Sequence, residues 1–440
     1  MPRAFVLLPL VLNACGARSV RDGIDGDDVE TDADADTDVT SDADADADSD
    51  TDGELDLGPD ARPSDYPEAA NWTDADPAAI EGEPCCELVG GPVQVDDAET
   101  HSRAGLVGWN GDGWGVVWTA SWTGADGALL FQALDQDGLR VGPTAQTATG
   151  HHSGAFDLEW GWDRYGVSIY TPREDFNAIT MLGAGGESLT DFTLLDADAT
   201  TPSIARYRHG DGWVVTYARE IEGYESPLEV IWVNDDGSIE GDPKPLGTSI
   251  SAAAPVVGLA SRAASVWAGS SGIQFRSFTW PDVESEPADF TILAMPTIED
   301  TTPDLVAYRD YAAVAVDNGD EATVMLVDPW EDRVVAGPGA IGTCDGTNSG
   351  AVVRLVPAEE RGFLGACWLS RYPRMADMVG EISFGLVGPD ATPWGEPIVV
   401  ASEPNVGGCA AGWNGQEFLV LLWRHREDSS VWVQRIRPGI

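Results

Sequence analysis

The stretch that decides the fold is residues 105–120, which read GLVGWNGDGWGVVWTA. Two apolar runs flank a tight Asn-Gly-Asp-Gly turn, and the same pattern returns in SIARYRHGDGWVVTYAR (203–219), LVAYRDYAAVAVD (305–317) and AAGWNGQEFLVLLWR (410–424). Polar, Gly-rich turns between apolar runs predict antiparallel hairpins, because glycine supplies the positive φ that such turns require. The chain therefore repeats one β unit.

The repeat has a period of about 50 residues. The residue that follows the turn is, in successive units, Trp114, Tyr165, Trp213, Ala263, Tyr311, Phe363 and Phe418. A second hairpin follows in each unit, for example at residues 129–146 and 230–247, so each unit has four strands. Four-stranded sheets bury both faces when they stack radially. We therefore predict an all-β, seven-bladed propeller of antiparallel blades, in which Trp109, Trp114 and Trp118 pack between blades.

The two chain ends predict how the ring closes. The seventh unit stops at Ile440 after its third strand, while GGPVQVD (90–96) matches the fourth strand WGEPIVV (394–400). We expect a propeller at 81–440 with a closing strand at 90–96 and repeats starting near 101, 151, 200, 250, 299, 347 and 405. This arrangement resembles the interlocked last blade of many seven-bladed propellers. No signature of a named propeller repeat accompanies it.

The N-terminus has the order of a secretory signal peptide, predicted at residues 1–14. Arg3 precedes the apolar run 4–12, which is about half the length of a membrane-spanning helix. Leu12-Asn13-Ala14-Cys15 resembles the lipobox of bacterial lipoproteins, although a smaller residue is usual at Asn13. The resemblance implies lipidation at Cys15 and, with Gly16 next, the outer membrane, at the cell surface or on the periplasmic face. The alternative is an ordinary secretion signal with an incidental cysteine.

Residues 15–80 are predicted to be a disordered acidic tether. Between Asp22 and Asp60 there are eighteen acidic residues and no Lys or Arg, a composition that cannot form a core. Asp48, Asp50 and Asp52 match the start of an EF-hand calcium loop. The position of its closing glutamate is occupied by Pro59, so the pattern does not predict a calcium site. Signal, tether and ring together resemble a loose group of bacterial surface lipoproteins that has no shared activity.

Charge excludes one class of partner. The chain has 75 acidic and 24 basic residues and a formal net charge of −51, so it repels nucleic acids and anionic lipids. We expect a monomer that contacts the membrane only through its lipid and uses no cofactor or metal. The partner class is an unidentified protein, peptide or glycan.

Five cysteines remain beyond Cys15, and an exported chain meets an oxidising compartment. Alignment of the repeats places Cys344, Cys367 and Cys409 toward one face of the ring. We predict a Cys344–Cys367 disulfide, with Cys409 as the rival partner of Cys367. The pairing of Cys85 and Cys86, which precede the closing strand, is left open.

The loops that join second to third strands carry arginines beside aromatic residues, as a docking surface for carboxylate, sulfate or peptide would. The alternative is that neighbouring carboxylates pair with these arginines as solvated loop charges. The predicted binding face consists of Trp122, Arg173, Arg219, Tyr224, Arg371, Tyr372, Arg374, Arg424, His425 and Arg426.

Two function classes follow from the sequence. The first is a non-catalytic, surface-anchored binding or scaffolding propeller, favoured because no catalytic motif is recognisable. The alternative is a secreted hydrolase or lyase that acts on a glycan, with carboxylates in the central channel. We predict no catalytic residue, and a deep channel with clustered carboxylates would favour the enzyme.

Overall fold

The computed structural model describes residues 61–97, 101–121, 127–149, 155–171, 176–195, 198–207, 212–219, 225–250, 254–283, 289–294, 302–344, 353–371, 379–424 and 429–440. All of these lie in one compact unit, Leu55–Ile440. The signal peptide, Cys15 and the acidic run to Asp60 lie outside the described residues.

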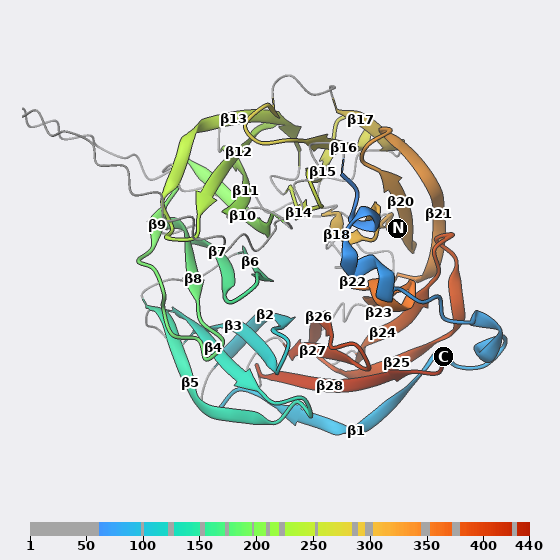
Figure 1. Cartoon of the computed structure of the whole chain (residues 1–440). Helices are drawn as coiled ribbons and strands as arrows, with labels where there is room; N and C mark the ends of the chain where they lie inside the picture. Colours follow the sequence, from blue (N-terminus) through green and yellow to red (C-terminus); the bar gives the residue numbers. More distant parts are fainter. Residues whose placement is uncertain are drawn as a thin grey trace, which may run out of the picture. The chain divides into compact units, whose positions relative to one another are not determined.

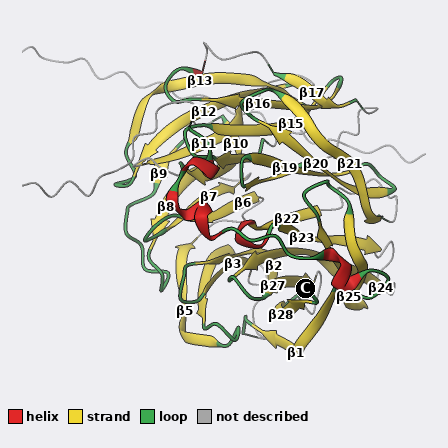
Figure 2. Ribbon diagram, turned by 45° about the vertical axis from the view of Figure 1, so that its right-hand side comes forward, coloured by secondary structure: helices red, strands yellow, loops and turns green. Residues whose placement is uncertain are grey.

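Seven four-stranded antiparallel sheets form the ring, in agreement with the predicted fold (Figures 1 and 2). The first three blades are β2 (His101–Trp109), β3 (Trp114–Ser121), β4 (Gly127–Leu134) and β5 (Arg140–Thr149); β6 (Ala155–Trp160), β7 (Tyr165–Thr171), β8 (Phe176–Leu182) and β9 (Thr193–Leu194); β10 (Ala199–Arg206), β11 (Gly212–Arg219), β12 (Ser226–Asn234) and β13 (Ile239–Ser249).

The next three blades follow the same order from the innermost strand outward. They are β14 (Val256–Gly258), β15 (Ala263–Gly269), β16 (Gly272–Phe278) and β17 (Phe290–Leu293); β18 (Asp304–Tyr308), β19 (Tyr311–Asp317), β20 (Glu321–Asp328) and β21 (Arg333–Thr343); β22 (Val353–Ala358), β23 (Phe363–Arg371), β24 (Val379–Val387) and β25 (Pro393–Pro404). A short helix, η5 (Glu359–Arg361), joins β22 to β23.

The seventh blade is built from both ends of the chain, as predicted. Its order is β1 (Cys86–Gln94), β28 (Val431–Pro438), β27 (Phe418–Arg424) and β26 (Val406–Trp413). The β1–β28 ladder runs from Cys86 opposite Pro438 to Gln94 opposite Trp432, and Arg437 pairs with Glu87 at 3.1 Å. The closing strand therefore starts earlier than the predicted residue 90.

The residue after each first turn packs between blades. Tyr165 and Trp213 are fully buried, and each lies against a glycine of the preceding blade, Gly115 and Gly166 respectively. A Cβ at Gly166 would come within 2.5 Å of the Trp213 ring, so only glycine leaves room for it.

Trp114 and Trp118, which were predicted to pack between blades, are both 1 % exposed and share a core cluster with residues of the seventh blade, so the prediction is confirmed for them. Trp109 packs only partly against the same cluster.

Residues 61–80 correct the predicted extent of the tether. They form η1 (Pro63–Asp65) and η2 (Pro67–Asn71), which lie on the ring beside β18 and β22, and η3 (Pro77–Ile80), which contacts β25 (Figure 1). We call residues 61–84 the N-terminal strap. Arg309 holds it through an ion pair with Asp74 at 2.8 Å and a cation–π contact with Trp72. These contacts order a segment whose composition alone predicts disorder.

The strap lies on one face of the ring. Arg309 lies in the turn between β18 and β19, and the Thr73 amide donates to the Glu360 carbonyl in the turn between β22 and β23. We call the face that carries these turns between first and second strands the turn face. No helix among the described residues is long and apolar enough to cross a membrane.

The predicted Cys344–Cys367 disulfide is wrong: Cys367 bonds the rival partner, Cys409. Alternation along β23 explains the choice, because neighbouring residues of a strand point to opposite faces. Cys367 shares a core cluster with Cys409 of β26, whereas Ala366 and Trp368 pack in the cluster that holds Cys344. The disulfide therefore joins the sixth blade to the seventh, and Cys344 is a buried free thiol.

Candidate functional site

A cavity of about 790 Å³ occupies the centre of the ring. Residues of all seven innermost strands, β2, β6, β10, β14, β18, β22 and β26, line its wall. The lining includes none of the described strap residues. Because every blade contributes one strand, the cavity is the central channel of the propeller, and its side chains have rigid backbone support.

Polar side chains gather where the innermost strands begin. Asp157 of β6 accepts hydrogen bonds from the Ser203 hydroxyl at 2.6 Å and from the Leu158 and Ile204 amides at 2.9 and 3.3 Å. Burial raises the pKa of Asp157 above its ordinary value, although these hydrogen bonds and the Arg354 charge act in the opposite direction. The channel therefore holds a carboxyl group that keeps its proton to a higher pH than an ordinary aspartate.

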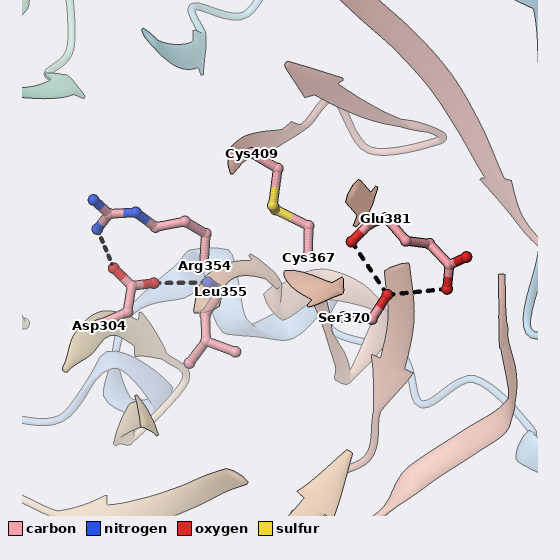
Figure 3. The surroundings of a disulfide bond; sticks show 7 residues. All are labelled: Asp304, Arg354, Leu355, Cys367, Ser370, Glu381 and Cys409. Carbon is pink, nitrogen blue, oxygen red and sulfur yellow. Dashed lines mark hydrogen bonds and ion pairs between the residues drawn. A yellow bond between two sulfur atoms is a disulfide. The ribbon is translucent and has the colours of Figure 1, made fainter. Parts of the chain in front are cut away.

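A second carboxylate faces the same channel in an ion pair. Asp304 accepts from Arg354 Nη1 at 2.7 Å and from the Leu355 amide at 2.7 Å, and these contacts join β18 to β22 (Figure 3). Burial lowers the pKa of Arg354, but the attraction of Asp304 and Asp157 outweighs it and raises the pKa overall. One third of the Arg354 side chain, 33 %, stays accessible from the channel.

Aromatic side chains line the other end of the channel, at the turn face. Trp109 packs edge-on against Trp114, and Trp160 against Tyr165, with ring centroids 4.8 and 4.5 Å apart. Trp162, in the turn after β6, is 64 % exposed, so the cavity reaches solvent here. Trp109, Trp160 and Trp162 therefore offer apolar surfaces to a ligand, and the buried Trp413 contributes to the lining.

The charged residues in the lining are largely paired within the protein. Among the described residues, four carboxylates (Asp157, Glu159, Asp304 and Glu359) and two arginines (Arg206 and Arg354) line the cavity. Arg354 pairs with Asp304, and Arg206 forms a short ion pair with Asp235. Since both arginines are already paired and acidic groups are in excess, the channel favours an uncharged, hydroxyl-rich ligand over an anion.

The predicted arginine-bearing face lies mostly outside the described residues. Of its ten residues, Trp122, Arg173, Tyr224, Tyr372, Arg374, His425 and Arg426 are not described. Arg219 pairs with Glu229 at 3.1 Å, Arg424 pairs with Glu403 and stacks over Trp432, and Arg371 is exposed at the end of β23. Two of the three described arginines thus have carboxylate partners, and the binding face stays a prediction.

The central channel was expected to hold the carboxylates of the alternative enzyme, but no residue was assigned to it. Trp109, which was predicted to pack between blades, is half-buried and lines the cavity. The sequence did contain a signal for this site. Trp109 is the last residue of β2, just before the turn, and Trp160 and Trp413 occupy the same position in their blades. No group of three His, Cys, Asp or Glu side chains suited to a metal occurs among the described residues.

The raised pKa of Asp157 predicts a pH dependence of stability. Its protonated form is favoured in the folded chain, so this contribution to the free energy of unfolding is fully present below about pH 4 and is lost as the pH rises through the raised pKa. Asp157→Asn should remove that loss. Urea unfolding of parent and variant across this pH range measures the difference, and parallel profiles would contradict it.

The comparisons with known proteins found distant similarities to solved structures. No family model matches the sequence, and no curated protein does. Among solved structures, the subtype N10 neuraminidase-like protein of A/little yellow-shouldered bat/Guatemala/060/2010 is 8 % identical, covers 80 % of this chain and 99 % of its own, and gives a TM-score of 0.43.

Two further structures are similarly distant. Kuenenia stuttgartiensis hydrazine synthase is 12 % identical over 62 % of this chain and 76 % of its own, with a TM-score of 0.42. An exo-1,5-alpha-L-arabinanase from a bovine ruminal metagenomic library is 11 % identical over 65 % of this chain and 91 % of its own, with a TM-score of 0.34. At these values the likeness carries no argument about activity.

Proposed function

We propose that this chain is a non-catalytic binding protein whose central channel receives the end of an uncharged glycan. The observation that carries the proposal is one cavity lined by tryptophans at one end and by hydrogen-bonding side chains at the other. Aromatic faces pack against the apolar faces of sugar rings, while carboxyl and hydroxyl groups bind sugar hydroxyls. Both features lie on the innermost strands or, for Trp162, in the turn that follows one of them.

The glycan is favoured over a peptide or a folded protein by the shape of the site. A cavity of about 790 Å³ falls within the range of small-ligand pockets, whereas protein partners need broad exposed surfaces. The excess of carboxylates also disfavours acidic ligands. A protein or peptide that docks on the arginine-bearing loops is the competing partner, and the binding screen below includes it.

We also propose a location for this activity. Lipid attached to Cys15 would anchor the chain to the outer membrane, and the acidic residues up to Asp60 would space the ring from the surface. The strap then fixes the point at which the tether leaves the ring, beside β18. The turn-face end of the channel would therefore lie near the tether attachment.

Substituting the most exposed channel tryptophan should weaken binding. For a neutral glycan selected on an array that also presents acidic glycans and peptides, Trp162→Ala should raise the dissociation constant roughly 10-fold or more, because exposed aromatic anchors dominate such contacts. Calorimetric titration measures the change. The matched control is Leu194→Ala, which truncates a side chain that is 61 % exposed on β9, away from the channel.

The control should bind as the parent does, and both variants should melt as the parent does. Equal loss in the two variants, or selection of an acidic peptide that Trp162→Ala still binds, would contradict the proposal. The second result would move the site to the arginine-bearing loops.

A second candidate is the glycan hydrolase, favoured by a specific observation. Asp157 and Asp304 face one channel in different environments, the first with a raised pKa and the second ion-paired, as a general acid and its partner carboxylate require. Incubation of the selected glycan with the protein separates the candidates. Intact glycan supports binding alone, whereas products that disappear with Asp157→Asn support hydrolysis.

A further inference from the structure

Two adjacent cysteines lie at the junction between the strap and the closing strand. Cys85 and Cys86 are 0 % and 6 % exposed, and their sulfur atoms are 3.0 Å apart. The backbone around them is fixed, since the Cys85 amide donates to the Glu396 carbonyl at 2.8 Å and the Gly439 amide donates to the Cys85 carbonyl at 2.9 Å. The two thiols therefore face each other in a position that the fold determines.

We propose that Cys85 and Cys86 form a vicinal disulfide, and that this bond is reduced more readily than Cys367–Cys409. A disulfide needs its sulfurs about 2.0 Å apart, so bond formation requires a movement of about 1 Å. Cys344, the remaining free thiol among the described residues, packs in a different core cluster. Each of these two cysteines therefore has the other as its partner.

The chemistry is thiol–disulfide exchange with a small disulfide such as oxidised glutathione. The thiolate of one cysteine attacks one sulfur of the oxidant and releases one glutathione thiolate. The other cysteine then loses its proton and attacks the protein sulfur of the mixed disulfide, which releases the second glutathione. Two thiols are oxidised to one disulfide, and one oxidant disulfide is reduced to two thiols. Since both sulfurs are buried in the closed ring, the exchange takes place before residues 84–86 dock or during their local opening.

Geometry separates this bond from the inter-blade disulfide. The Cα atoms of adjacent residues are about 3.8 Å apart across a trans peptide, below the usual disulfide range of about 4.4–6.8 Å. The Cα atoms of Cys367 and Cys409 are 6.4 Å apart, within that range. Strained disulfides are the reducible ones, so Cys85–Cys86 responds to the redox state of the compartment while Cys367–Cys409 keeps the blades joined.

The first test locates the thiols in the full chain. The protein is alkylated with iodoacetamide in denaturant without reductant and cleaved after glutamate, which releases the peptide Gly82–Glu87. Mass spectrometry should find this peptide unalkylated and lighter than its dithiol form by two hydrogen atoms, while Cys344 is alkylated as the internal control. Two alkyl groups on the peptide, or a cross-link to Cys344 or to a second chain, would overturn the proposal.

The second test compares how readily the two disulfides are reduced. The protein is equilibrated at graded ratios of reduced to oxidised glutathione, and free thiols are then alkylated. Cys85–Cys86 in the peptide Gly82–Glu87 should be reduced at a ratio roughly 10-fold or more lower than the ratio that reduces Cys367–Cys409. Cys86→Ser is the matched variant, and its Cys85 should be found only as the alkylated thiol or as the mixed disulfide with glutathione, never in an internal disulfide. Simultaneous opening of the two bonds, or the reverse order, would overturn the difference in reducibility.

Discussion

Deletion of the chain through Asp97 should leave a protein without a cooperative thermal transition. That truncation removes β1, whose ladder with β28 closes the ring, and it also removes the fully buried Val95. The backbone groups of β28 would become an unpaired edge, which favours aggregation. Whole domains have a free energy of unfolding of only about 5–15 kcal/mol. Loss of the strand that closes the seventh blade is expected to cost more free energy than this. Calorimetry and size-exclusion chromatography measure both effects.

The control is deletion through Glu81, which keeps β1 and removes most of the strap. This variant should still melt cooperatively at a lower temperature than the parent, because it loses strap contacts such as Arg309–Asp74 but keeps the sheet intact. Equal melting temperatures for the two truncations would contradict closure by the N-terminal strand.

Replacing both Cys367 and Cys409 by Ser should lower the free energy of unfolding by about 4 kcal/mol. The estimate follows from the chain entropy that a cross-link over a separation of 42 residues removes from the unfolded state. Substitution is preferable to reductant, which would also act on Cys85 and Cys86. Urea unfolding measures the change.

Cys344→Ser serves as the control because it changes a buried thiol that has no disulfide. It should cost clearly less than the double variant. A double variant within about 1 kcal/mol of the parent would show that the bond does not restrain the unfolded chain.

The propeller was predictable because its pattern is local and repeated seven times. Each first turn is followed by a residue that packs between blades, and the positions of Tyr165 and Trp213 in the structure match the alignment of the repeats. Closure was predictable for the same reason, since residues 90–96 look like a fourth strand without a blade.

The two predictions that proved wrong, the disulfide pairing and the extent of the tether, concern features that depend on contacts between residues far apart in the sequence. The pairing of Cys367 follows from strand alternation: odd-numbered residues of β23 face the seventh blade, and Ala366 and Trp368 face the fifth. The repeat alignment could not supply this parity, because Phe363 faces the seventh blade whereas the aligned Tyr165 and Trp213 face the preceding blade. The strap could not be found from the sequence either, because its order comes from Arg309, more than two hundred residues away, rather than from its own composition.

The channel site was not recognised from the sequence because a tryptophan before a turn can have two roles. A tryptophan before a turn packs between blades or lines the channel according to the direction of its side chain, and Trp109 partly does both. The clustering of Asp157, Asp304 and Arg354 is likewise produced by closing the ring, which brings three separate blades around one axis.

The most direct test of the account is a crystal structure of the protein grown with the tightest-binding neutral glycan from the array. We expect an intact glycan whose terminal sugar lies in the channel against Trp109, Trp160 or Trp162, with its hydroxyl groups hydrogen-bonded to Asp157 or Arg354. A glycan bound only on the loops that carry Arg371 and Arg424, or a cleaved glycan in the channel, would contradict it.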